Sequence, residues 1–111
     1  MKPRFHALGR LKTGTLNKTE QLYQDDLDDA QHLGDIQWHK FEGLKLRLAD
    51  NTFYTPDFAV MAADGVLEMH EVKGFWTDDA RVKIKVAASI YPFRFIAVKK
   101  SKSGWEREVF E

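Results

Sequence analysis

The residues best suited to chemistry in this sequence are three acids and a lysine: Glu20, Asp57, Glu71 and Lys73. Carboxylates packed at the edge of a core repel one another and resist desolvation, so such a cluster is costly unless it holds a cation. Oxygen ligands without cysteine or a histidine pair favour Mg²⁺ or Mn²⁺, bound at about 2.0–2.1 Å. A lysine beside the ion adds a charge that holds an attacking water and offsets charge on phosphoryl oxygens.

The stretch LEMHEVKG, residues 67–74, supplies two of the four. In a strand, alternate residues share a face, so Glu71 and Lys73 continue the apolar row that Leu67 and Met69 begin. A register shift of one residue does not separate them, because it moves the whole row together. The strand therefore either leaves the core here or holds the two charges half-buried.

The loop before this strand decides which residue faces Glu71. A three-residue loop that ends at Gly65, with this glycine in the left-handed conformation, places Asp57 opposite Glu71. A two-residue loop would pair Asp57 with Val72, on the other face. We favour the longer loop because it keeps the apolar residues of both strands on one face. A bend at Pro56 could also bring Asp57 next to Glu71.

A helix is predicted from Asn17 to about Leu33. Asn17 is a suitable N-cap, Glu20 stands where it completes a capping box, and Gly34 is a suitable stop. The apolar stripe of this helix contains Leu16, Tyr23, Leu27 and Ala30. Glu20 lies at the edge of that stripe, so a helix that covers this face of the sheet directs the Glu20 carboxylate toward Asp57 and Glu71. A capping role alone also explains a glutamate at this position.

The other elements follow from periodicity and turn signals. Alternating leucines at 44–48, the turn at 50–51 and the strands at 57–61 and 67–73 predict a three-stranded antiparallel meander. A second helix, capped at Thr77, ends before Pro92. Two apolar stripes run along this second helix and predict heavy burial, one of Ala80, Ile84, Ala87 and Tyr91 and the other of Val82, Val86 and Ile90.

Strands at 93–98 and 105–110 complete the chain. The order of helix, three strands, helix and strand predicts an α/β fold with a mixed central sheet flanked by helices. Residues 1–16 read as a basic arm and 17–111 as one domain. With 111 residues, of which 43% are hydrophobic, the chain is long enough for one core.

The charge layout permits a polyanionic partner although the formal net charge is zero. From residue 73 to 107, nine basic residues stand against three acidic ones. There is no cysteine, no apolar run that spans a bilayer and no signal-peptide pattern at the N-terminus, so a cytoplasmic location is expected.

The motif Pro56-Asp57 followed by Glu71-Val72-Lys73 resembles the PD-(D/E)xK signature of the restriction-endonuclease-like nucleases. The predicted order of elements is similar to the common core of that superfamily. More narrowly, the segments NKTE, YTPDF, EVKGFW and KIKVAASIYPF resemble the phage endonuclease I group of Holliday-junction resolvases, over roughly residues 9–98.

This resemblance implies a role for each residue of the motif. Asp57 and Glu71 would be metal ligands, with the Val72 carbonyl completing one site. Lys73 would position and activate the water, and Glu20 would bind a second metal or orient the first. Two metals would lie about 3.5–4 Å apart.

Basic residues outside the motif are candidates for DNA contact. They are Arg10, Lys12 and Lys18 near the arm, and Arg81, Lys83 and Lys85 on the second helix. Phe75 and Trp76 fit either stacking on bases or packing. His70 falls on the face opposite Glu71, and none of the four histidines has ligand spacing, so surface or core-edge roles are favoured for them.

These observations predict a Mg²⁺- or Mn²⁺-dependent endodeoxyribonuclease, for which the resemblance suggests branched DNA in phage replication or recombination. Symmetric cutting of a junction further predicts a homodimer. Two alternatives stay open: a non-catalytic module that binds DNA or a phage partner, and a nicking or restriction-type nuclease that acts on linear duplex.

Overall fold

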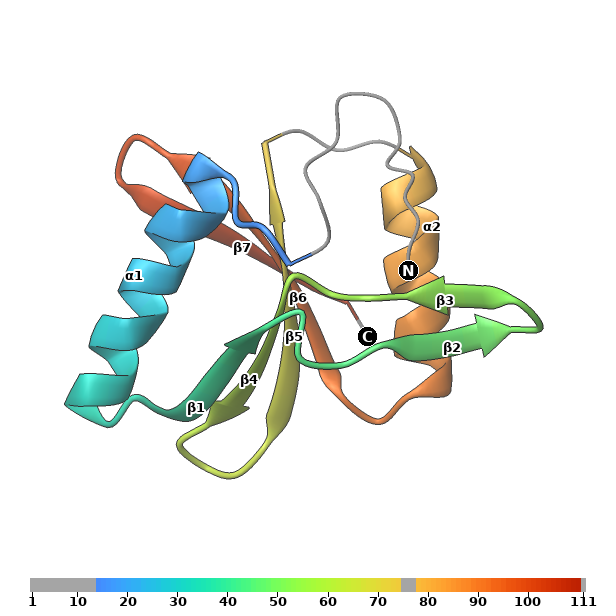
Figure 1. Ribbon diagram of the computed structural model, residues 1–111, viewed down its shortest axis with the longest axis horizontal. Coiled ribbons are helices and arrows are strands. Elements are labelled where there is room, and N and C mark those ends of the chain that lie inside the picture. The colour runs from blue at the N-terminus through green and yellow to red at the C-terminus, as the bar shows by residue number, and fades with distance from the viewer. Residues whose placement is uncertain (1–13, 75–77, 111) are drawn as a thin grey trace.

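The computed structural model describes residues 14–74 and 78–110 as an α/β fold built on a mixed sheet (Figure 1). Its elements are α1 (Lys18–Leu33), β1 (Ile36–Phe41), β2 (Leu46–Ala49), β3 (Thr52–Tyr54), β4 (Phe58–Ala62), β5 (Leu67–Lys73), α2 (Asp78–Ile90), β6 (Arg94–Ser101) and β7 (Gly104–Phe110). Five strands pair in the order β1-β4-β5-β6-β7. Only β5 and β6 are parallel, joined through α2, so the predicted mixed α/β sheet is confirmed.

The two helices lie on opposite faces of the sheet (Figure 1). Tyr23 and Leu27 of α1 pack on a face that includes Phe58 and Val72. Ile84 and Ala87 of α2 pack on the other face, in a cluster formed with Leu46, Tyr54, Ala59, Met69, Phe95, Ala97 and Phe110. Each face of the sheet therefore has its own hydrophobic core.

Both ends of α1 form as the sequence predicts. The Asn17 side chain accepts the Glu20 N–H at 2.8 Å, and Glu20 Oε1 accepts the Asn17 N–H at 3.0 Å, which closes the capping box. Gly34 ends the helix at φ 85°, a conformation that costs a residue with a Cβ. Both helix ends are therefore closed by contacts between residues that are near one another in the sequence.

The β4–β5 hairpin has the register expected for the three-residue loop. Ala59 pairs with Met69, and Gly65 has φ 86°. The ladder ends at the pair Phe58 and His70, so the last three residues of β5 extend beyond β4 and pair only with β6. The segment of β5 that carries Glu71 and Lys73 therefore pairs with β6 on one side. Its other side is not paired with a strand, and Asp57 lies there.

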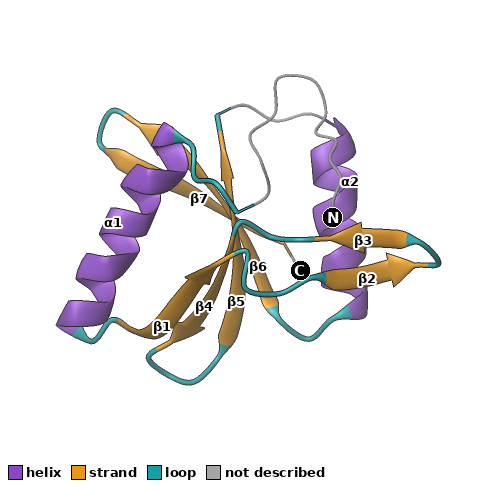
Figure 2. Cartoon of the chain, viewed as in Figure 1, coloured by secondary structure: helices purple, strands orange, loops and turns teal. Residues whose placement is uncertain are grey.

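The predicted meander is wrong in its first strand. The neighbour of β4 is β1, while β2 and β3 pair with each other in a separate two-stranded sheet (Figure 2). Glu42, at φ 49°, follows β1 and turns the chain out of the main sheet. Leu46 is buried as the alternation suggests, but against the α2 side of the core and not within the main sheet. Alternation of apolar and polar residues predicts that one face of a strand is buried, but it does not predict which part of the protein covers that face.

Three further predictions are corrected by the packing. The second apolar stripe of α2 is uncovered, because Val82, Val86 and Ile90 are 56%, 37% and 49% exposed. His70 is buried beneath α1, where Nδ1 is hydrogen-bonded to the Tyr23 hydroxyl at 2.5 Å and Nε2 to Glu68 Oε1 at 2.9 Å. Finally, α1 does not cover the face that carries Glu71.

None of the helices in the described part of the chain is both long enough and apolar enough to cross a membrane.

Candidate active site

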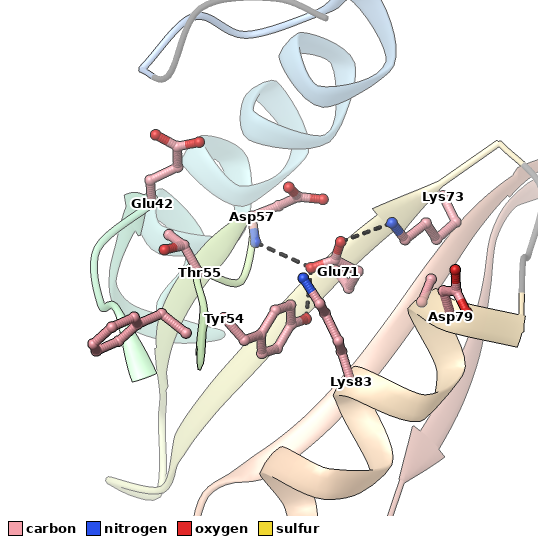
Figure 3. Close-up of a pocket in the computed structure, with 10 residues that line it drawn as sticks. Glu42, Tyr54, Thr55, Asp57, Glu71, Lys73, Asp79 and Lys83 are labelled. Atoms are coloured by element: carbon pink, nitrogen blue, oxygen red, sulfur yellow. Dashed lines mark hydrogen bonds and ion pairs between the residues drawn. The ribbon is translucent and has the colours of Figure 1, made fainter. Parts of the chain in front are cut away.

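A pocket of about 530 Å³ opens at the end of the sheet where β5 extends beyond β4 (Figure 3). Asp57, Glu71 and Lys73 all line it. The other residues that line the pocket are Glu42, Phe53, Tyr54, Thr55, Asp79, Ala80 and Lys83. The structure therefore brings the three residues of the sequence motif to one concave surface.

Glu71 is held by contacts to both of its carboxylate oxygens. Oε1 accepts a hydrogen bond of 2.6 Å from the Tyr54 hydroxyl, and the Asp57 N–H lies 3.4 Å from the same oxygen. Oε2 is 2.9 Å from Nζ of Lys73 (Figure 3). Only 8% of Glu71 is exposed, so this carboxylate is half of a largely desolvated ion pair with a fixed orientation.

Asp57 reaches the site from the loop between β3 and β4. Its Oδ2 accepts the Val72 N–H at 2.8 Å, which extends the contact between the two segments past the last β4–β5 pair. Burial, followed by the neighbouring Glu71 carboxylate, raises the pKa of Asp57 to about 8; Glu20 also raises this pKa, while the Val72 N–H and Lys73 lower it. Four acidic residues line the pocket against two lysines, and they are Glu42, Asp57, Glu71 and Asp79 against Lys73 and Lys83.

Val72 is the third predicted ligand, through its carbonyl oxygen. The N–H and C=O groups of one strand residue point to the same side of the strand. Because the Val72 N–H points at Asp57, its carbonyl also faces the gap left by β4. This orientation is compatible with the predicted role.

Glu20 does not join the other two carboxylates. Across residues 14–74 and 78–110, no three acidic, histidine or cysteine side chains gather in a group that could hold a metal ion. The reason is the placement of α1, which packs on the Val72 face and not on the Glu71 face, while Oε1 of Glu20 caps the helix. Its charge still acts on Asp57, whose pKa it raises. A role for Glu20 at a second metal stays a prediction.

The donors that do meet fit a small hard cation. Asp57 and Glu71 offer only oxygen atoms, and the backbone carbonyl of Val72 would add one more. Mg²⁺ is commonly bound in proteins by one or two carboxylates, with waters and substrate phosphates completing its octahedron. Two carboxylates with unbalanced charge at an open pocket match this pattern better than a closed site with only protein ligands.

Tyr54 and Glu42 contact the motif residues directly, and neither was predicted from the sequence as part of the site. Tyr54 orients Glu71, and burial, with the Glu71 carboxylate beside it, raises the pKa of the Tyr54 hydroxyl so that it stays a donor. The Glu42 N–H donates to the Asp57 carbonyl at 2.7 Å, and its carboxylate accepts the Gly14 N–H. The sequence YTPDF places Tyr54 near Asp57, but only the tertiary fold aims its hydroxyl at Glu71.

The candidate DNA contacts separate into different groups. Lys83 extends from α2 into the pocket (Figure 3). Arg81 instead makes a bidentate pair with Glu108 of β7, at 2.9 and 3.1 Å. Lys18 and Lys85 are exposed and are not among the residues that line the pocket. The predictions for Arg10, Lys12, Phe75, Trp76 and the Thr77 cap fall outside the described residues.

Comparisons of this chain with protein-family models, with curated proteins and with solved structures found no match.

Proposed function

We propose that this protein is a metal-dependent endodeoxyribonuclease of the PD-(D/E)xK type, acting on branched DNA such as Holliday junctions in phage replication or recombination. The observation that carries the proposal is the meeting of Asp57, Glu71 and Lys73 in one pocket. The Asp57 N–H lies 3.4 Å from Glu71, and the Lys73 ammonium lies 2.9 Å from it. Two adjacent carboxylates and a lysine are the groups that this hydrolysis requires.

The order of the elements also supports the finer fold assignment. With the β2–β3 hairpin treated as an insertion, the chain runs α1, β1, β4, β5, α2, β6. This is the order of helix, three strands, helix and strand expected for a restriction-endonuclease-like core. The motif residues lie at the end of β5 and just before β4, which is where that core needs them.

Asp57 and Glu71 would hold Mg²⁺ or Mn²⁺, with the Val72 carbonyl as a further ligand. When bound, the ion would supply Lewis-acid stabilisation of charge on the scissile phosphate and a lower pKa for a bound water. It would also stabilise the ionised form of Asp57, whose pKa is raised by burial and by the neighbouring Glu71 carboxylate.

The side chains of the pocket would perform the remaining work. Lys73 is held beside Glu71 and is 25% exposed, so its ammonium can bind an incoming water or phosphate oxygen without leaving the pair. Tyr54 keeps Glu71 in one orientation through its hydroxyl. Lys83 adds a second cation from α2, suited to a neighbouring phosphate of the DNA strand.

The direct test is cleavage of a labelled four-way junction and of a matched linear duplex, each in Mg²⁺, Mn²⁺ or EDTA. We expect metal-dependent cutting by the wild type, a preference for the junction, and no cutting by Lys73→Ala. Equal cutting of both substrates would replace the branched-DNA assignment with a nicking or restriction-type nuclease. DNA binding without cutting in either metal would leave only a binding module.

Symmetric cutting of a junction needs two active sites, so we also propose a two-fold homodimer. Light scattering should give twice the mass of the 12.9 kDa chain. A monomeric mass, both alone and with junction DNA, would contradict the dimer and would leave the nuclease assignment to be decided by the cleavage test.

A further inference from the structure

The β2–β3 hairpin projects from the body of the protein and reaches the main sheet through loops at both ends (Figures 1 and 2). Its two faces differ. Leu46 and Tyr54, a cross-strand pair, are buried and anchor the hairpin on the core beside α2. The next pair, Arg47 and Phe53, occupies the outer face and is exposed. The outer face is thus free of the packing that fixes the inner one.

Phe53 links this outer face to the candidate active site. It is 42% exposed and lines the pocket that contains Asp57 and Glu71. Nζ of Lys45 stands 4.6 Å from the centroid of the Phe53 ring, a cation–π arrangement. Arg47, across the hairpin from Phe53, is paired with Asp50. An exposed aromatic ring with a lysine ammonium over it therefore lies at the pocket.

Phe53 contributes little to the core, and part of its ring surface stays exposed beside the Lys45 ammonium. Bases stack on such rings whatever their sequence, and neighbouring lysines follow the phosphates of the same strand. A base inside a duplex has both faces covered by its neighbours, whereas an unpaired base does not. The chemistry of Phe53 and Lys45 therefore suits an unpaired nucleotide.

We propose that Phe53 and Lys45 form a binding site for one unpaired nucleotide of the DNA strand, next to the phosphate held at Asp57, Glu71 and Lys73. The base stacks on the Phe53 ring and Lys45 contacts the adjoining phosphate. The placement of this site beside the scissile bond rests on the proposed nuclease function. The binding of an unpaired nucleotide at Phe53 and Lys45 does not depend on that function. The site makes strand separation, as at a flap, gap or open junction, the feature that the protein recognises.

The test uses two DNA duplexes of identical sequence around the cleavage point, one fully paired and one with three unpaired nucleotides in one strand. Cleavage of both is measured for the wild type, Phe53→Leu, Phe53→Trp and Lys45→Ala. Trp38→Leu is the matched control, because Trp38 is 41% exposed on β1 and is not among the residues that line the pocket. Binding of the same DNAs is measured in EDTA, where no metal-dependent cutting occurs.

We expect Phe53→Leu to lower cleavage and binding of the DNA with unpaired nucleotides by about tenfold, the usual scale of one base–aromatic contact. The fully paired DNA should change little, Phe53→Trp should retain the preference, and Lys45→Ala should weaken binding in a salt-dependent way. Equal losses on both DNAs, or the same loss in Trp38→Leu, would overturn the inference. If the wild type cuts neither DNA, cleavage of the four-way junction decides the nuclease assignment, and the EDTA binding data alone decide whether Phe53 holds an unpaired nucleotide.

Discussion

The Tyr54 hydroxyl donates a hydrogen bond of 2.6 Å to Oε1 of Glu71, the carboxylate that also pairs with Lys73. Tyr54 is the last residue of β3, so the small hairpin sheet controls the orientation of a residue in the main sheet. Burial raises the pKa of Tyr54, so the hydroxyl remains protonated over the working pH range and always acts as the donor. The hairpin is therefore part of the candidate active site and not an appendage to it.

Removal of this hydroxyl should lower activity more than stability. We expect Tyr54→Phe to reduce the cleavage rate by about tenfold, because a hydrogen bond to a charged group contributes about 1.5–3 kcal/mol and Glu71 loses its fixed orientation. Tyr91→Phe is the control, since its hydroxyl donates to the Arg47 carbonyl at 2.7 Å outside the pocket. Equal rates for the two variants would show that Tyr54 does not orient Glu71.

Loss of the Lys73 ammonium should abolish cleavage. Among the described residues, Lys73 is the only one that forms an ion pair with Glu71 Oε2. We therefore expect Lys73→Ala to lower the cleavage rate by at least about a hundredfold while junction binding is retained. Lys102→Ala, in the turn between β6 and β7, should cut normally. Retained cutting in Lys73→Ala would rule out its catalytic role.

Asp57 should make stability depend on pH. Its pKa is about 8 in the folded protein against 3.8 for an ordinary carboxyl, so the folded state holds this proton more tightly. The resulting stabilisation is complete below about pH 4 and is lost as the pH rises through 8, with a limiting slope of about 1.4 kcal/mol per pH unit.

Asp57→Asn should therefore be more stable than the wild type in metal-free buffer, and its advantage should grow between pH 5 and 8, about the window that the folded-state pKa sets. Urea unfolding at several pH values measures the difference. Asp29→Asn, an exposed substitution on α1, should show no such trend. A constant difference between Asp57→Asn and the wild type over this range would contradict the raised pKa.

Divalent metal should stabilise the wild type by binding the folded state only. We expect millimolar Mg²⁺ or Mn²⁺ to raise the melting temperature by several degrees, about what a binding energy of 1 kcal/mol gives in a domain of this size. Asp57→Ala should lose most of the rise. If the same rise persists in Asp57→Ala and in Glu71→Ala, the ion binds elsewhere.

Much of the local structure around the candidate site is determined by the sequence alone. The caps of α1, the three-residue loop that ends at Gly65, and the pairing of Ala59 with Met69 are all confirmed. They could be predicted because each depends on a few residues close in sequence, through a side-chain cap, a left-handed glycine or the period of a strand. The same register predicts Asp57 beside Glu71, and the Asp57 N–H lies 3.4 Å from Glu71 Oε1.

Tertiary structure decided which surfaces those elements cover. Periodicity identified an apolar stripe on α1 but not the face of the sheet that it packs against, and that face separates Glu20 from Glu71. The insertion of β2 and β3 as a separate hairpin brought Tyr54 and Phe53 to the pocket, and the path of α2 brought Lys83. Which surfaces pack together depends on contacts between segments that are distant in the sequence. The local pattern of apolar and polar residues does not determine those contacts.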